Sequence, residues 1–89
     1  MFSIETVADL LHEHKQRATY GAVAGLLGVP SRSLMQNYTK GRRFSWIVNQ
    51  KTGLPTDYAP SQIDPDLKLR PKILATEAEL VQWLRSLGA

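Results

Sequence analysis

The first fifteen residues place apolar side chains three and four positions apart, which is the spacing of one face of an α-helix. Ser3 has the side-chain oxygen that caps a helix start, and acids follow it in the first turns. We therefore expect a helix over about Ser3 to Lys15. Its apolar stripe consists of Ile4, Val7, Leu10 and Leu11, with His14 beside them.

Two more helices are predicted directly after the first. Thr19 is a suitable cap for a helix from about Tyr20 to Leu27, and Gly28 suits the left-handed position that ends a helix. Pro30 suits the first turn of the next helix because it has no amide hydrogen to leave unpaired. We expect that third helix to reach about Tyr38.

A polar, basic loop then leads to a β-type pattern. Aromatic and β-branched residues at 44–49 predict a strand. Gly53 provides the unusual backbone angles of a turn, and Pro55 restricts the return strand of the hairpin to an edge. Three prolines make the stretch from Tyr58 to Pro71 irregular, and a short strand is expected around Lys72 to Ala75.

The chain closes with a fourth helical pattern. Thr76 and Glu79 have the spacing of a capping box, and Gly88 ends the helix. Its apolar stripe consists of Leu80, Val81, Leu84 and Leu87. The order helix, helix, helix, hairpin, helix predicts a mainly α fold with a small β-hairpin, in the α+β class. It is that of a single winged helix-turn-helix domain over residues 1–89 with an added C-terminal helix.

Composition narrows the class of protein. With 89 residues the chain is long enough for one domain, and no apolar run reaches the roughly 18 residues of a membrane span. The start is amphipathic and contains acids, so it does not resemble a signal peptide. The absence of cysteine excludes disulfides, thiolate metal sites and cysteine nucleophiles. These features fit a cytoplasmic, bacterial-type protein.

The basic residues are unevenly distributed. Between His14 and Thr56 there are seven basic residues and no acid, whereas the rest of the chain holds four basic and eight acidic residues. A surface of one sign attracts a partner of the other sign, so this region favours nucleic acid; a solvated basic face is the alternative. The seven residues are Lys15, Arg17, Arg32, Lys40, Arg42, Arg43 and Lys51.

The stretch from Thr19 to Tyr38 fits the template of a helix-turn-helix. Two short helices meet at a steep angle, so the residue at their crossing must be small, and a glycine turns the chain four residues later. With Gly28 as the turn, Ala24 falls at the crossing. The flanking core positions are then Val23, Leu27, Val29 and Leu34.

The second helix of that motif presents polar side chains suited to base edges and phosphates. They are Ser31, Arg32, Ser33, Gln36 and Asn37, and their alternative role is that of a solvated helix face. Further basic residues would contact the DNA backbone beyond this helix. They are Lys40, Arg42 and Arg43 in the loop and Lys51 at the tip of the hairpin.

Here the sequence resembles a known family. The pattern T-Y-G-x-x-A-x-x-x-G-x-P, followed by the hairpin sequence WIVNQKTGLPTDY, is similar to the DNA-binding domain of the alkylguanine-DNA alkyltransferases and the alkyltransferase-like proteins. The resemblance covers Thr19 to about Tyr58. It implies a helix-turn-helix that binds duplex DNA through the minor groove and turns a modified guanine into a pocket beside the hairpin.

The chain departs from this family where alkyl transfer takes place. The acceptor motif Pro-Cys-His-Arg corresponds here to the stretch from Arg43 to Trp46, without cysteine or histidine, so transfer to a thiolate is chemically excluded. The alkyltransferase-like proteins carry tryptophan instead of the cysteine, and Trp46 lies about two positions away. The family's base-replacing arginine corresponds to Leu34, which the helix-turn-helix template makes a core residue instead of a wedge between bases.

The resemblance also assigns two tyrosines. Tyr20 corresponds to a tyrosine that helps turn the nucleotide out, and Tyr58 to one on the hairpin side of the pocket. The alternative roles are a partly buried cap residue for Tyr20 and a core-closing aromatic for Tyr58. Leu34, Trp46 and Tyr58 would therefore line a pocket if one is present, although strand alternation favours a core position for Trp46.

The sequence offers few residues for metal binding or catalysis. His12 and His14 are two residues apart on a helix and point in different directions, so they cannot share a metal ion. Asp64 and Asp66 have the spacing of turn residues more than that of a catalytic pair. We expect no enzyme activity, no cofactor and no metal.

These observations predict a small, non-catalytic protein that binds duplex DNA and serves either damage recognition or transcriptional control. The alternative is a protein-interaction module that keeps the helix-turn-helix fold, for example an accessory or mobile-element product. A homodimer is compatible with both. The two readings differ in whether the seven basic side chains converge on one face.

Overall fold

The structure is a computed structural model that describes residues 3–30, 33–34, 41–56, 58–67, 69 and 72–88. The described residues form a small α+β fold. Its elements are the helices α1 (Ile4–His14), α2 (Tyr20–Leu27) and α4 (Glu77–Ser86), the strands β1 (Arg17–Thr19), β2 (Ile47–Val48) and β3 (Ile73–Leu74), and the 3-10 turns η1 (Arg42–Phe44) and η2 (Pro60–Gln62).

The helices begin where local signals predict them. The side chains of Ser3, Thr19 and Thr76 each accept a hydrogen bond from a backbone N–H in the first turn, which satisfies a donor that has no partner within the helix. At the end of α2, Gly28 adopts a left-handed conformation with φ of 71°. The predicted bounds of these helices are confirmed to within two residues.

The sheet differs from the predicted hairpin. Its strand order is β2-β1-β3, and β1 pairs in parallel with both neighbours. Ala18 is opposite Ile47 on one side and Leu74 on the other. The short strand predicted near 72–75 is confirmed as β3, whereas β2 covers only two of the six predicted residues.

A tight turn after β2 explains why no return strand forms among the described residues 50–56. The N–H of Gly53 donates to the carbonyl of Asn49, and the N–H of Asn49 donates to the carbonyl of Leu54. Pro55 has no N–H, and the N–H of Thr56 donates to the hydroxyl of Tyr20 instead of to β2. The chain therefore turns away from β2, and none of the described residues 50–56 pairs with this strand.

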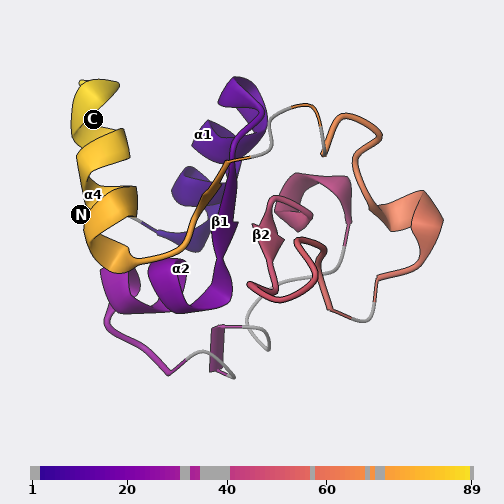
Figure 1. Cartoon of the computed structure of the whole chain (residues 1–89), viewed down its shortest axis with the longest axis horizontal. Helices are drawn as coiled ribbons and strands as arrows, with labels where there is room; N and C mark the ends of the chain where they lie inside the picture. The colour runs from indigo at the N-terminus through magenta and orange to yellow at the C-terminus, as the bar shows by residue number, and fades with distance from the viewer. Residues whose placement is uncertain are drawn as a thin grey trace.

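The hydrophobic core lies between the helices and the sheet. In Figure 1, α4 lies beside α2 at one end of the molecule, and η2 lies at the other end beyond β2. The largest fully buried side chains come from segments far apart in the sequence and include Leu11, Leu34, Trp46, Ile47 and Leu80. None of the helices in the described part of the chain is long and apolar enough to cross a membrane.

Candidate nucleic-acid interface

The chain changes direction at the end of α2, where the sequence predicts the turn of a helix-turn-helix. The N–H of Val29 donates to the carbonyl of Ala24, and the N–H groups of Ser33 and Leu34 both donate to the carbonyl of Pro30. The chain thus leaves α2 at Gly28, and residues 33–34 are again helical. Leu34 is only 1% exposed and packs in the core that also contains the buried Ala24. Leu34 therefore takes the core role that the template gave it.

Several predicted contact residues fall where the structure gives no description. Ser33 is described and is half-buried. Ser31, Arg32, Gln36, Asn37, Lys40 and the side chain of Arg42 lie outside the described residues. The structure therefore describes the corner that would position these side chains, and not the side chains themselves.

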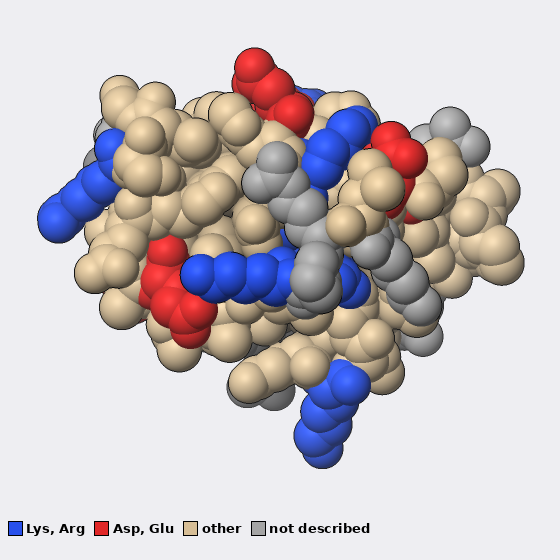
Figure 2. Space-filling view, turned by 45° about the horizontal axis from the view of Figure 1, so that its top comes forward, with Lys and Arg blue, Asp and Glu red and all other residues tan. Residues whose placement is uncertain are grey.

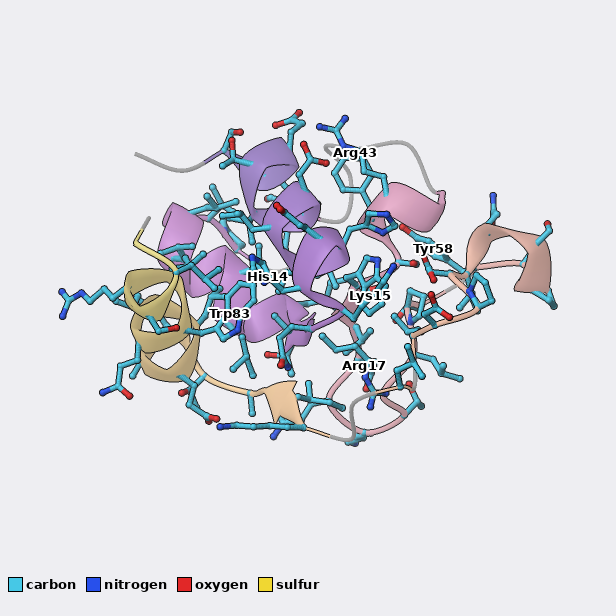
Figure 3. All side chains as sticks on the ribbon, turned by 90° about the horizontal axis from the view of Figure 1, so that it is seen from above. His14, Lys15, Arg17, Arg43, Tyr58 and Trp83 are labelled. Carbon is cyan, nitrogen blue, oxygen red and sulfur yellow. The ribbon has the colours of Figure 1, made fainter. Side chains whose placement is uncertain are left out.

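Arg43 is bound to another residue of the same chain. Its Nε and Nη2 atoms donate to the two carboxylate oxygens of Asp9 in α1, at 2.7 and 2.9 Å. Its guanidinium also lies 5.3 Å from the centre of the Phe44 ring. The hydrogen bond with Asp9 raises the pKa of Arg43 above its ordinary value, and the same bond lowers the pKa of Asp9. Figure 3 shows Arg43 alongside α1, where it ties η1 to that helix.

Arg17 and Lys15 also make contacts within the molecule. Arg17 is buried in β1, its Nη1 donates to the carbonyl of Gly53 at 2.9 Å, and burial lowers its pKa from the ordinary value. The Nζ atom of Lys15 lies 3.6 Å from a carboxylate oxygen of Asp66 and 5.8 Å from the centre of the Trp46 ring. A charge count along the sequence cannot detect this inward use of basic residues.

Figure 2 shows Lys and Arg side chains at several places on one face of the molecule, with Asp and Glu side chains beside some of them. Among the seven basic residues of the central stretch, Arg43 and Lys51 are exposed, and Arg43 is paired with Asp9. Within the described residues, fewer basic side chains are therefore available to a partner than the sequence indicates.

Lys51 lines a cavity that the sequence analysis did not predict. The cavity has a volume of about 360 Å³ and lies where β1 and β2 end and α2 begins. Its lining residues are Thr19, Tyr20, Gly21, Val48, Asn49, Gln50, Lys51 and Ala75. Thr19 and Val48 are the last residues of β1 and β2, and Ala75 directly follows β3. The carboxyl ends of the three parallel strands therefore meet at this cavity.

The polar groups around this cavity are suited to an anion. The first N–H groups of a helix lack partners within it and carry the positive end of the helix dipole, so α2 directs positive potential towards its N-terminal end. The side chain of Asn49 is held by a hydrogen bond from the N–H of Lys51 at 2.8 Å. The lining contains one cation and no acid. The sequence indicated this cavity only indirectly, because its lining residues come from three separate segments of the chain.

The two tyrosines and Trp46 have different surroundings. Tyr20 lines the cavity, is largely buried and accepts a hydrogen bond through its hydroxyl from the N–H of Thr56 at 2.8 Å. Trp46 is fully buried, and its Nε1 donates to Nδ1 of His12 at 2.9 Å. Tyr58 is half-buried. Neither Trp46 nor Tyr58 nor Leu34 lines the cavity.

Within the described residues, no group of three or more His, Cys, Asp or Glu side chains could hold a metal ion. His12 contacts Trp46, and His14 contacts Trp83, so the two histidines do face different neighbours. No family model, curated protein or solved structure matches this chain. The resemblance to the alkyltransferase family therefore stays a prediction.

Proposed function

We propose that this chain is a small, non-catalytic protein that binds duplex DNA through a helix-turn-helix, similar to the DNA-binding domain of the alkyltransferase-like proteins. The observation that carries the proposal is the corner after α2. Gly28 turns the chain, and the buried Leu34 locks the first turn of the next helix against the core. The turn over residues 49–54 takes the place of the hairpin wing.

The cavity supports the proposal because it offers a second contact with DNA. Backbone N–H groups at a helix N-terminus bind phosphate, and ligands of sheets with parallel strands bind outside the strands' carboxyl ends. The cavity and the corner lie at opposite ends of α2, whose eight residues span about 12 Å. This separation corresponds to roughly three to four base-pair steps of about 3.4 Å each. The proposal places one duplex against both ends of α2.

Alkyl transfer is not part of the proposal. The chain has no cysteine, and Phe44, at the position of the acceptor cysteine, is largely buried. The remaining roles are damage recognition and transcriptional control, and both require binding without chemistry. A duplex that contains an alkylated guanine distinguishes them by its affinity relative to the unmodified duplex.

Fluorescence anisotropy over a series of salt concentrations tests the proposal. We expect micromolar or tighter binding to a duplex of about 20 base pairs, with a log–log salt slope of about −3 to −5 for about four or five phosphates contacted. Lys51→Ala should reduce this slope by about 0.9 because it removes one phosphate contact. Lys72→Ala is the matched control, since Lys72 is also exposed but directly precedes β3, at the opposite end of the sheet from the cavity.

One observation favours the alternative of a protein-interaction module. Lys15, Arg17 and Arg43 are engaged within the molecule, so they are less available to a nucleic acid than the charge count along the sequence indicates. Absence of DNA binding at low salt, with a folded protein, would contradict the DNA proposal. The helix-turn-helix corner would then serve as architecture, and a protein partner would be sought.

A further inference from the structure

His12, in the last turn of α1, places one ring nitrogen between two buried polar groups. Its Nδ1 atom is 2.9 Å from the indole Nε1 of Trp46 and 3.4 Å from a carboxylate oxygen of Asp64. Trp46 is fully buried, and the Asp64 side chain is 7% exposed, whereas the His12 side chain is 46% exposed. Solvent can therefore exchange protons with the histidine but reaches neither partner easily.

The two contacts need opposite protonation states of the same atom. An indole N–H can only donate, so Nδ1 accepts from Trp46 only when it carries no hydrogen, and the hydrogen of the neutral ring is then on Nε2. In that state its lone pair faces the Asp64 carboxylate, which can also only accept. A protonated Nδ1 donates to Asp64 and can no longer accept from Trp46. One proton thus determines which of the two partners is bound.

The carboxylate of Asp64 is held in place by its own neighbours. The N–H of Asp66 donates to the other carboxylate oxygen of Asp64 at 2.8 Å, and the N–H of Asp64 donates to the hydroxyl of Ser45. Trp46 is held in the core. The histidine ring is therefore the member of the trio that can change its position.

We propose that His12 is a proton-operated switch that binds Trp46 when neutral and Asp64 when protonated. Histidine is the side chain that ordinarily changes its charge between about pH 5 and pH 8. Because Trp46 leads into β2 while Asp64 belongs to the segment 58–67, protonation transfers the attachment of α1 from the sheet to that segment. The switch goes beyond the proposed DNA binding and does not depend on it.

Other charged groups surround the switch in pairs. Lys15 lies beside Asp66, and Arg43 is bound to both carboxylate oxygens of Asp9. The pKa of Asp9 is lowered mainly by its hydrogen bond with Arg43, and His12 contributes least among the causes. Among the described residues around the ring, Asp64 is therefore the acid that is placed to receive the proton-bearing nitrogen.

Two-dimensional NMR of the indole N–H groups in the full chain tests this switch. Over a titration from about pH 8 to about pH 5, we expect the Trp46 indole resonance to move with the same midpoint as the His12 ring. Its hydrogen exchange should accelerate, relative to the rate expected for that pH, as the acceptor is lost. Trp83 is the internal comparison: its ring contacts that of His14 edge to face, with 5.6 Å between the ring centroids (Figure 3), so its resonance reports a change of charge on a neighbouring histidine.

Two variants separate the switch from a merely structural role. His12→Gln keeps an acceptor but does not titrate, so the Trp46 resonance should no longer change with pH. His14→Gln should leave the Trp46 response unchanged.

Clear outcomes would overturn the proposal. One is a Trp46 resonance that stays constant while the His12 ring titrates. Another is a pH response that persists in His12→Gln. If His12→Gln does not fold, as shown by circular dichroism, the wild-type titration still decides the question.

Discussion

Two regions of this small fold use charged residues in opposite ways. On the α1 side, each described cation near η1 and the segment 58–67 is neutralised by an acid of the same chain: Arg43 by Asp9 and Lys15 by Asp66. At the start of α2, the cavity is lined by Lys51 and by the first residues of a helix, without an acid. The comparison teaches that net charge along the sequence does not locate a binding surface. What matters is which charges remain available after folding.

The largest effect is expected from breaking the corner that supports the α2 side. Leu34→Ala removes a fully buried side chain and leaves a cavity, which should lower the free energy of unfolding by about 2–5 kcal/mol. Urea denaturation followed by circular dichroism measures the loss. Leu69→Ala is the control, because Leu69 is 67% exposed. A similar loss in both variants would show that Leu34 does not hold the corner.

Substitution of the glycine in the turn after α2 should have a smaller effect on stability. Gly28→Ala places a side chain at φ of 71°, a left-handed conformation that costs an L-residue roughly 1–2 kcal/mol. No atom lies within 4 Å of the added Cβ, so the loss should come from the backbone alone. Gly41→Ala, which also meets open space, should change the stability less. Thermal unfolding compares the two, and equal midpoints would contradict the assigned role of Gly28.

A double variant of the ion pair between Asp9 and Arg43 tests, at constant net charge, whether a paired cation contributes to DNA binding. The double variant Asp9→Ala/Arg43→Ala removes one charge of each sign, and we expect the salt dependence of DNA binding to stay unchanged. Lys51→Ala also removes one side chain from the surface but should reduce the log–log slope by about 0.9. Anisotropy titrations measure both. A reduced slope in the double variant would mean that Arg43 exchanges Asp9 for a phosphate when DNA binds.

The smallest effect concerns the pH dependence of stability on the α1 side. Because the hydrogen bond with Arg43 lowers the pKa of Asp9 in the folded state, this pair stabilises the fold at neutral pH. The contribution is lost as the pH falls below about 4, where the carboxylate becomes protonated. Asp9→Asn should therefore be slightly less stable than the wild type around pH 7 and equal to it well below pH 4. Urea midpoints at both pH values test this, and an equal difference at both would refute it.

The helical part of the fold follows from local signals in the sequence. Ser3, Thr19 and Thr76 cap helices because their side-chain oxygens lie next to N–H groups of the same turn. Gly28 ends α2 for an equally local reason, its freedom to adopt positive φ. Such interactions involve residues at most a few positions apart, so a linear pattern predicts them.

The sheet and the candidate site could not be predicted in this way. The tight turn after β2 and the N–H of Thr56 bonded to Tyr20 prevent the expected hairpin, and the latter contact spans 36 residues. The cavity gathers residues 19–21, 48–51 and 75, which are neighbours only because β1 pairs with both β2 and β3. The sequence assigns Tyr20 and Lys51 to the predicted DNA interface, but it does not predict that they line one cavity.

The sequence by itself determined the helices α1, α2 and α4, the turn at Gly28, the position of Leu34 in the core and the absence of thiol chemistry. Only the tertiary structure decided the parallel sheet, the inward use of Arg17 and the pairing of Arg43 with Asp9. The physical reason is the separation along the sequence over which each interaction acts. Caps and turns depend on backbone geometry over a few residues, whereas strand pairing, burial of a cation and ion pairs depend on which distant segments the packed core brings together.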